Sequence, residues 1–125
     1  MIVLDTSALV AFLRSEPGQE VVASHFADAC MSAVNLSETL ARMVREGIEP
    51  RALRQQLDDL RLGVVDFDPA QAVIAAEIRE HARRHGVGLA DCCCLALALH
   101  MALPVVTADR PWLRLGFDIQ VILIR

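Results

Sequence analysis

Four acidic residues, Asp5, Glu38, Asp91 and Asp109, lie near points where apolar runs give way to helical sequence. Asp5 follows the run Ile-Val-Leu, and Asp109 follows Val-Val-Thr-Ala. Carboxylates that crowd together repel one another, which raises their pKa values. A divalent cation between them relieves this repulsion, and hard cations such as Mg²⁺ and Mn²⁺ prefer oxygen ligands. Such a set could activate water and hydrolyse a phosphodiester bond.

Short apolar runs and amphipathic segments alternate along the chain. We expect strands over 2–4, 30–32, 64–67, 105–107 and 119–124, and helices over 6–14, 19–27, 36–45, 50–62, 69–85 and 91–99. The last helix is apolar on every side, which is typical of a buried helix. Strands that alternate with helices form a parallel sheet covered on both faces. The sequence therefore predicts an α/β fold: a three-layer α/β/α domain with a central parallel sheet of about five strands.

This fold would bring the acidic residues together. Open parallel sheets bind ligands beyond the carboxyl ends of their strands. Asp5 and Asp109 should share that edge, and the helix starts that carry Glu38 and Asp91 should open onto it. Hydroxyl side chains next to these acids could form an outer shell around a metal; they are Thr6, Ser7 and Thr107.

Each acid also has a purely structural interpretation. Asp5 and Asp91 could cap the helices that follow them, and Asp109 could belong to a turn or a cap. The segment Asn35-Leu-Ser-Glu38 resembles a capping box with Asn in place of Ser or Thr. Taken singly these interpretations are the stronger ones, but four such acids at one sheet edge favour a metal site.

Composition limits the remaining possibilities. The 125 residues suit a single domain spanning 1–125, and all 12 basic residues are Arg. The absence of Lys excludes a Walker A phosphate loop and a Schiff-base lysine. The cysteines, Cys30 and the run Cys92–Cys94, match no zinc motif and suggest reduced thiols. With no signal peptide and no membrane-spanning run apparent, we expect a cytoplasmic protein.

The charge balance still permits an RNA substrate. The formal net charge of −4 equals the charge of the four candidate ligand acids, so the rest of the chain is balanced. Arginine must then make every contact to phosphate. Arg42 and Arg45 follow Glu38 on one helix face and could bind phosphate, although an i,i+4 ion pair between Glu38 and Arg42 is an equal alternative. Arg110, next to Asp109, is a weaker candidate.

Four segments resemble the motifs of PIN-domain proteins, in particular VapC-type toxins. The opening Met-Ile-Val-Leu-Asp-Thr-Ser-Ala resembles the first motif, and Ser-Ala-Val-Asn-Leu-Ser-Glu-Thr-Leu, beginning at Ser32, resembles the second. Leu-Ala-Asp-Cys-Cys-Cys-Leu-Ala-Leu-Ala resembles the third, and Leu-Pro-Val-Val-Thr-Ala-Asp-Arg-Pro-Trp, beginning at Leu103, the fourth. The motifs occur in family order, and the resemblance spans essentially the whole chain.

This resemblance implies a Mg²⁺- or Mn²⁺-dependent ribonuclease, the toxin of a toxin–antitoxin pair. The family's acidic catalytic and metal-binding positions match Asp5, Glu38, Asp91 and Asp109. It also implies a homodimer and a VapB-like antitoxin whose C-terminal segment blocks the acidic groove. The run Cys92–Cys94 departs from the aliphatic residues or Ala more usual there, which should affect packing rather than the site.

Two other functions remain open on the sequence. One is a catalytically silent module of the same fold that binds RNA or protein. The other is a phosphotransfer enzyme, but enzymes of that kind with an aspartyl nucleophile commonly have a second Asp two residues later. This chain has Ser7 there, and no Lys to balance the phosphate.

Overall fold

The computed structural model describes all residues from 1 to 125 and contains a five-stranded parallel sheet. The strand order is β3-β2-β1-β4-β5, and every neighbouring pair is parallel. The strands are β1 (Ile2–Leu4), β2 (Ala29–Ser32), β3 (Gly63–Val65), β4 (Val105–Thr107) and β5 (Val121–Leu123). The helices are α1 (Thr6–Leu13), α2 (Gln19–His25), α3 (Ala33–Val44), α4 (Pro50–Asp59), α5 (Pro69–Arg84) and α6 (Leu89–Met101), with short 3₁₀ segments η1 (Phe26–Asp28) and η2 (Arg110–Arg114).

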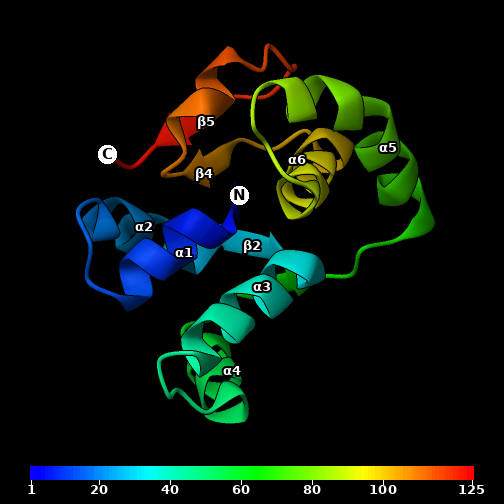
Figure 1. The fold of residues 1–125 in the computed structure, drawn as a ribbon. Helices are drawn as coiled ribbons and strands as arrows, with labels where there is room; N and C mark the ends of the chain where they lie inside the picture. Colours follow the sequence, from blue (N-terminus) through cyan, green and yellow to red (C-terminus); the bar gives the residue numbers. More distant parts are fainter.

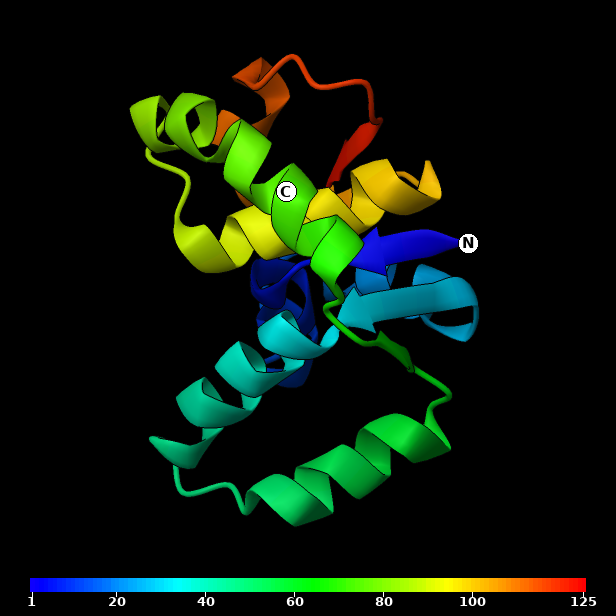
Figure 2. The same ribbon diagram turned by 90° about the vertical axis from the view of Figure 1, so that its right-hand side faces the viewer.

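The sheet separates two layers of helices, as the sequence predicts (Figures 1 and 2). Successive strand residues face opposite sides of a sheet. Accordingly, Leu4 packs in the core beneath α1 to α4, whereas Val3 packs in the core beneath α5, α6 and η2. Both side chains are fully buried, so β1 has apolar contacts on both faces. The three-layer α/β/α prediction is therefore confirmed.

Several element boundaries differ from the sequence prediction. Helix α3 begins at Ala33 rather than at residue 36, because the hydroxyl of Ser32 caps it by accepting from the Val34 backbone N–H at 3.2 Å. The predicted helix over 19–27 ends as α helix at His25 and continues as the 3₁₀ segment η1. Strand β5 covers only Val121–Leu123 because its sole neighbour, β4, is itself three residues long.

The helix that the sequence predicts as apolar on every side is α6, and it lies buried in the centre. Every residue from Cys92 to Ala98 is buried, and α5 packs along the outside of α6. All four cysteines are free and buried, and burial raises the pKa of each thiol. These thiols therefore pack as small apolar groups. None of the six α-helices combines the length and the apolar character that a membrane-spanning helix requires.

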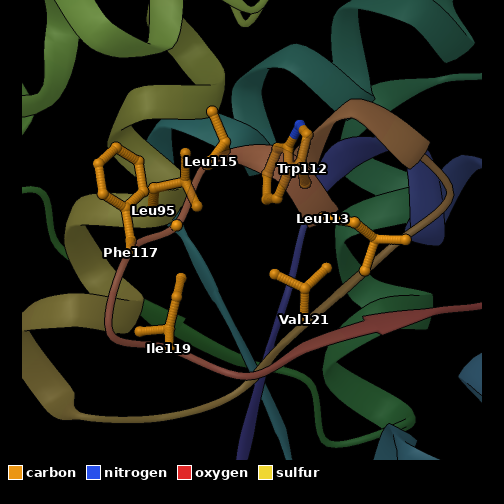
Figure 3. Close-up of a pocket in the computed structure, with 8 residues that line it drawn as sticks. Leu95, Trp112, Leu113, Leu115, Phe117, Ile119 and Val121 are labelled. Carbon is orange, nitrogen blue, oxygen red and sulfur yellow. The ribbon is translucent and has the colours of Figure 1, made fainter.

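Trp112 anchors the segment between β4 and β5. Its side chain is only 1% exposed, so it is an internal packing group and no platform for stacking a base. Together with Leu95 and Phe117 it borders an apolar cavity of about 150 Å³ beneath η2 and β5 (Figure 3). No ionisable residue lines this cavity.

Candidate active site

Asp5 is the buried centre of a cluster of polar groups at the carboxyl edge of the sheet. It follows β1 directly and is only 2% exposed. Its Oδ1 accepts from the Ala8 backbone N–H at 2.8 Å. Asp5 therefore caps α1, as the structural interpretation of this residue predicts. Burial raises its pKa from 3.8 to about 7, although the hydrogen bonds oppose this shift. Capping and a chemical role are thus compatible for this residue.

Two hydroxyl groups join the ends of β1 and β4 around Asp5. The Thr107 hydroxyl donates to Asp5 Oδ2 at 2.8 Å and accepts from the Asp109 backbone N–H at 3.0 Å. The Ser7 hydroxyl lies 2.8 and 2.9 Å from the two Asp5 oxygens and accepts from the Ala108 backbone N–H at 2.9 Å. These bonds fix the Asp5 carboxylate relative to the backbone at Asp109. Asp109 itself makes no capping bond through its side chain.

Glu38 reaches the same edge from the second turn of α3. The Thr6 hydroxyl donates to Glu38 Oε1 at 2.5 Å and also lies 3.3 Å from the Asn35 carbonyl oxygen. Thr6 thereby links the start of α1 to the helix that carries Glu38. The capping-box interpretation of Asn35 and Glu38 is wrong, because Ser32 already caps this helix and Asn35 lies inside it.

Asp91 approaches the cluster from the first turn of α6. The helix is capped by Gly88, and Asp91 Oδ2 accepts from the Gly88 backbone N–H at 3.2 Å. Asp91 is therefore the third residue of α6 and not its first, which corrects the predicted start at residue 91. Its pKa is raised mainly by burial and also by the negative charges of Glu38 and Asp109. All four predicted acids thus influence one another electrostatically or through shared hydrogen bonds.

A cleft of about 220 Å³ opens at this edge. Its walls include three of the four predicted acids, Asp5, Asp91 and Asp109. Glu38 stands beside it, bonded to Thr6, which is itself a lining residue. The complete lining is Asp5, Thr6, Ser7, Arg42, Asp91, Ala108, Asp109 and Arg125. The cleft therefore combines carboxylates, hydroxyls and two guanidinium groups.

The predicted arginines separate into one at the cleft and two outside it. Arg42 lines the cleft, and its Nη2 lies 3.5 Å from Glu38 Oε2. The place at the cleft and the ion pair with Glu38 are therefore compatible for this residue. Arg45 lies at the exposed C-terminal cap of α3, and Arg110 is exposed at the start of η2; neither lines the cleft. Their predicted contact with substrate phosphate stays a prediction, since neither residue is among those that line the cleft.

Two residues at the site were not predicted from the sequence. Arg125 lines the cleft because it follows β5, and the carboxyl ends of parallel strands share one edge. Asn35 is fully buried, and its Nδ2 donates to the Ala90 carbonyl at 3.0 Å, which ties α3 to the start of α6. The signal for Arg125 was its position after the final strand. Asn35 gave no such signal, since its partner is 55 residues away.

The donor set suits a hard divalent cation in its chemistry. Carboxylates are the ligands that Mg²⁺ takes, usually one or two from the protein with water completing the coordination shell. No three acidic, histidine or cysteine side chains are arranged so that they could hold one metal ion together. Asp5 and Asp91 lie at the same cleft and both have raised pKa values, which is consistent with a site that supplies one or two carboxylate ligands. The residues present therefore fit Mg²⁺ or Mn²⁺ better than a fully protein-enclosed metal.

Comparison with known proteins places this cleft in a family. The model of the PIN domain matches residues 2–118, which is most of the chain and includes all four acids. The chain belongs to the PIN domain family. This match confirms the resemblance of its motifs to PIN-domain proteins, and the toxin relative described next supports the VapC-type assignment.

Relatives of this PIN-domain chain match it over nearly their full lengths. It is 30% identical to Toxin FitB of Neisseria gonorrhoeae over 122 residues, covering 87% of this chain and 88% of that protein. The crystal structure of FitAcB from Neisseria gonorrhoeae matches with a TM-score of 0.72 and 28% identity, covering 99% and 98% of the two chains. The DNA-bound VapBC of Salmonella typhimurium has the same fold, with a TM-score of 0.73, 23% identity and full coverage of both chains.

Proposed function

We propose that this PIN-domain chain is a metal-dependent endoribonuclease, the toxin of a toxin–antitoxin pair, and that Asp5, Glu38, Asp91 and Asp109 form its active site. The observation that carries the proposal is the convergence of three of these acids on one cleft with the fourth beside it. The raised pKa of Asp91, caused partly by Glu38 and Asp109, supports it because such crowding is typical of functional sites. The family and the named toxin relative support the same reaction class.

The proposed roles follow from the contacts of each residue. Bound Mg²⁺ or Mn²⁺ would supply an activated water and neutralise the phosphate during hydrolysis. Asp5, Asp91 and Asp109 line the cleft; one or two of them would ligate the cation directly, and the others, with Glu38 beside them, would bind its water ligands. Thr6, Ser7 and Thr107 donate to two of these carboxylates and would keep them oriented. Arg42 would bind a substrate phosphate at the rim.

Metal dependence is the direct test of this proposal. The purified protein is expected to cleave single-stranded and structured RNAs with Mg²⁺ or Mn²⁺, to lose that activity with EDTA, and to regain it when excess metal is returned. Gel analysis of end-labelled RNA measures the cleavage. A phosphomonoester offered in parallel should not turn over. RNA cleavage that persists in EDTA would contradict a metal site, and the absence of cleavage under every condition would favour a silent binding module.

The hydroxyl of Thr6 tests the proposed orienting role. Thr6→Val keeps the shape of the side chain and removes the donor to Glu38 Oε1, which is expected to lower cleavage about 10- to 100-fold. Thr6→Ser is the matched control, because it restores the hydroxyl without the methyl group. Rates are measured at saturating metal on one RNA. Equal losses in both variants would assign the effect to packing in place of the hydrogen bond.

The proposed partners are RNA, a VapB-like antitoxin and a second copy of the chain. FitAcB and VapBC, the complexes of the relatives, support an antitoxin partner. A homodimer is supported by an apolar groove of about 390 Å³ beside α5, lined by Phe67, Ala72, Ala75 and Leu89 among others. Leu89 is 64% exposed beside this groove, so a partner surface that covered both would bury apolar area.

A further inference from the structure

We infer that Arg125 is a substrate-binding residue of this cleft and contacts a phosphate of RNA beside the four acids. Arg125 lines the cleft together with Asp5 and Asp109, and its side chain is 39% exposed. The inference rests on the proposed function, since it assigns a second phosphate contact to the same site.

The fold holds Arg125 at this position through the residue before it. Ile124 is buried and its backbone N–H donates to the Thr107 carbonyl at 3.0 Å, next to the site. The turn between α1 and α2 lies against Ile124 at Gly18, where a Cβ atom would come within 2.6 Å of the Ile124 carbonyl oxygen. Gly18 also has a φ of +95°, a conformation that favours glycine. This close approach brings the turn within reach of the Arg125 side chain.

One end of the Arg125 guanidinium is anchored on that turn. Its Nη1 donates to the Pro17 carbonyl at 3.1 Å and to Glu16 Oε1 at 3.4 Å. Neither Nε nor Nη2 has a protein partner in the structure. A guanidinium offers several donors in one plane and suits phosphate oxygens. The side chain is therefore fixed at one edge while its other donors remain available to an anion.

Arg125 differs from Arg42 in the acid that each one faces. Arg42 lies beside Glu38, which is a proposed member of the active site. Arg125 pairs with Glu16, which belongs to the α1–α2 turn and does not line the cleft. The positive charge of Arg125 is therefore not paired with a proposed metal ligand.

The order of the strands places the two arginines at opposite ends of the acidic cluster. Along the sheet, β2 precedes β1, β4 and β5 in space. Arg42 belongs to α3, which follows β2, whereas Asp5 follows β1, Asp109 follows β4 and Arg125 follows β5. An RNA strand lying across these strand ends would meet a cation, then the acids, then a second cation. Phosphates on either side of the scissile bond would thus be neutralised.

The test measures RNA binding separately from cleavage. In an Asp5→Asn background that cannot cleave, fluorescence anisotropy with Mg²⁺ reports the Kd for a short, fluorescein-labelled single-stranded RNA of mixed sequence. Arg125→Ala is expected to raise Kd roughly tenfold, the equivalent of one charge-assisted hydrogen bond. The slope of log Kd against log salt concentration should fall by about 1, the value expected for the loss of one phosphate contact. With Asp5 intact, Arg125→Ala should raise KM for cleavage while kcat stays close to that of the wild type.

Three comparisons decide the outcome. Arg51→Ala removes an arginine on α4 that forms no ion pair and does not line the cleft, and should leave Kd unchanged. Glu16→Gln keeps an oxygen acceptor for Arg125 and removes the opposing charge, so RNA binding should stay equal or become tighter. If Glu16→Gln weakens binding as much as Arg125→Ala and both lower Tm, Arg125 only secures the turn and the inference is wrong.

Unchanged Kd and KM in Arg125→Ala, with a wild type that cleaves, would overturn this inference alone. A wild type that neither binds nor cleaves RNA would overturn the proposed function with it.

Discussion

Replacing Asp5 by Asn is expected to lower RNA cleavage by more than about 100-fold while the chain stays folded. Loss of an outer partner of a metal ligand typically costs 10- to 100-fold, so loss of the central carboxylate should cost more. Asn retains an oxygen that can accept from the Ala8 backbone N–H, so the cap of α1 survives. The measurement is the initial cleavage rate of one RNA at saturating Mg²⁺, with circular dichroism to verify folding.

The matched control for this variant is Asp118→Asn. Asp118 is exposed, does not line the cleft and makes no side-chain hydrogen bond or ion pair, so the substitution by Asn should leave cleavage unchanged. Asp91→Asn and Asp109→Asn should resemble Asp5→Asn, because both side chains face the same cleft. The proposal fails if Asp5→Asn cleaves as fast as Asp118→Asn. A strongly lowered Tm in all three site variants would instead assign these acids a structural role.

Asp5 should also make the metal-free protein less stable as pH rises. Its pKa in the folded chain is raised from 3.8 to about 7 because the carboxyl group is buried. The folded chain therefore keeps a proton that the unfolded chain releases, so stability is fully present below about pH 4 and is lost as pH rises towards 7. A shift of about three pKa units corresponds to roughly 4 kcal/mol. Asp5→Asn should exceed the wild type in free energy of unfolding by up to that amount above pH 7.

Urea unfolding in EDTA at a series of pH values measures this difference. The two proteins should be nearly equal in stability near pH 4, and the gap should open between pH 4 and 7 and then stay constant. Asp118→Asn again serves as the control, since an exposed carboxylate has no burial to lose. An Asp5→Asn protein that is less stable than the wild type at pH 8 would contradict the raised pKa and show that the hydrogen bonds of Asp5 outweigh its burial.

Local sequence patterns were sufficient to predict the three layers of this fold and most of its helices and strands. The apolar run of α6 predicted a buried helix because a helix without a polar face has no side to turn to water. Pro69 after Asp68 marked the start of α5, where Asp68 Oδ1 accepts from the Gln71 backbone N–H at 2.8 Å. Both features depend only on residues within a few positions of each other, which is why they can be recognised without a structure.

The predicted boundaries failed where a cap or a strand partner decided them. Helix α3 begins three residues earlier than predicted because Ser32, and not Asn35, occupies the capping position. Helix α6 begins at Leu89, before the predicted residue 91, because Gly88 is its cap. Asp91 lies in the first turn and accepts from the Gly88 backbone N–H. At α3 both Ser32 and Asn35 are residue types that can cap a helix, and at α6 the cap is a glycine with no capping side chain, so the local sequence does not select the boundary.

The sequence by itself determined that four acids would lie near the carboxyl ends of strands, because strand order along the chain and the parallel rule are enough for that. Only the tertiary structure decided which basic groups join them. Arg42 and Arg125 line the cleft, whereas Arg45 and Arg110 do not. The reason is that the cleft lies where β1 is flanked by β2 and β4, with β5 beyond them. That order arises from packing between residues far apart in the chain, which no local pattern encodes.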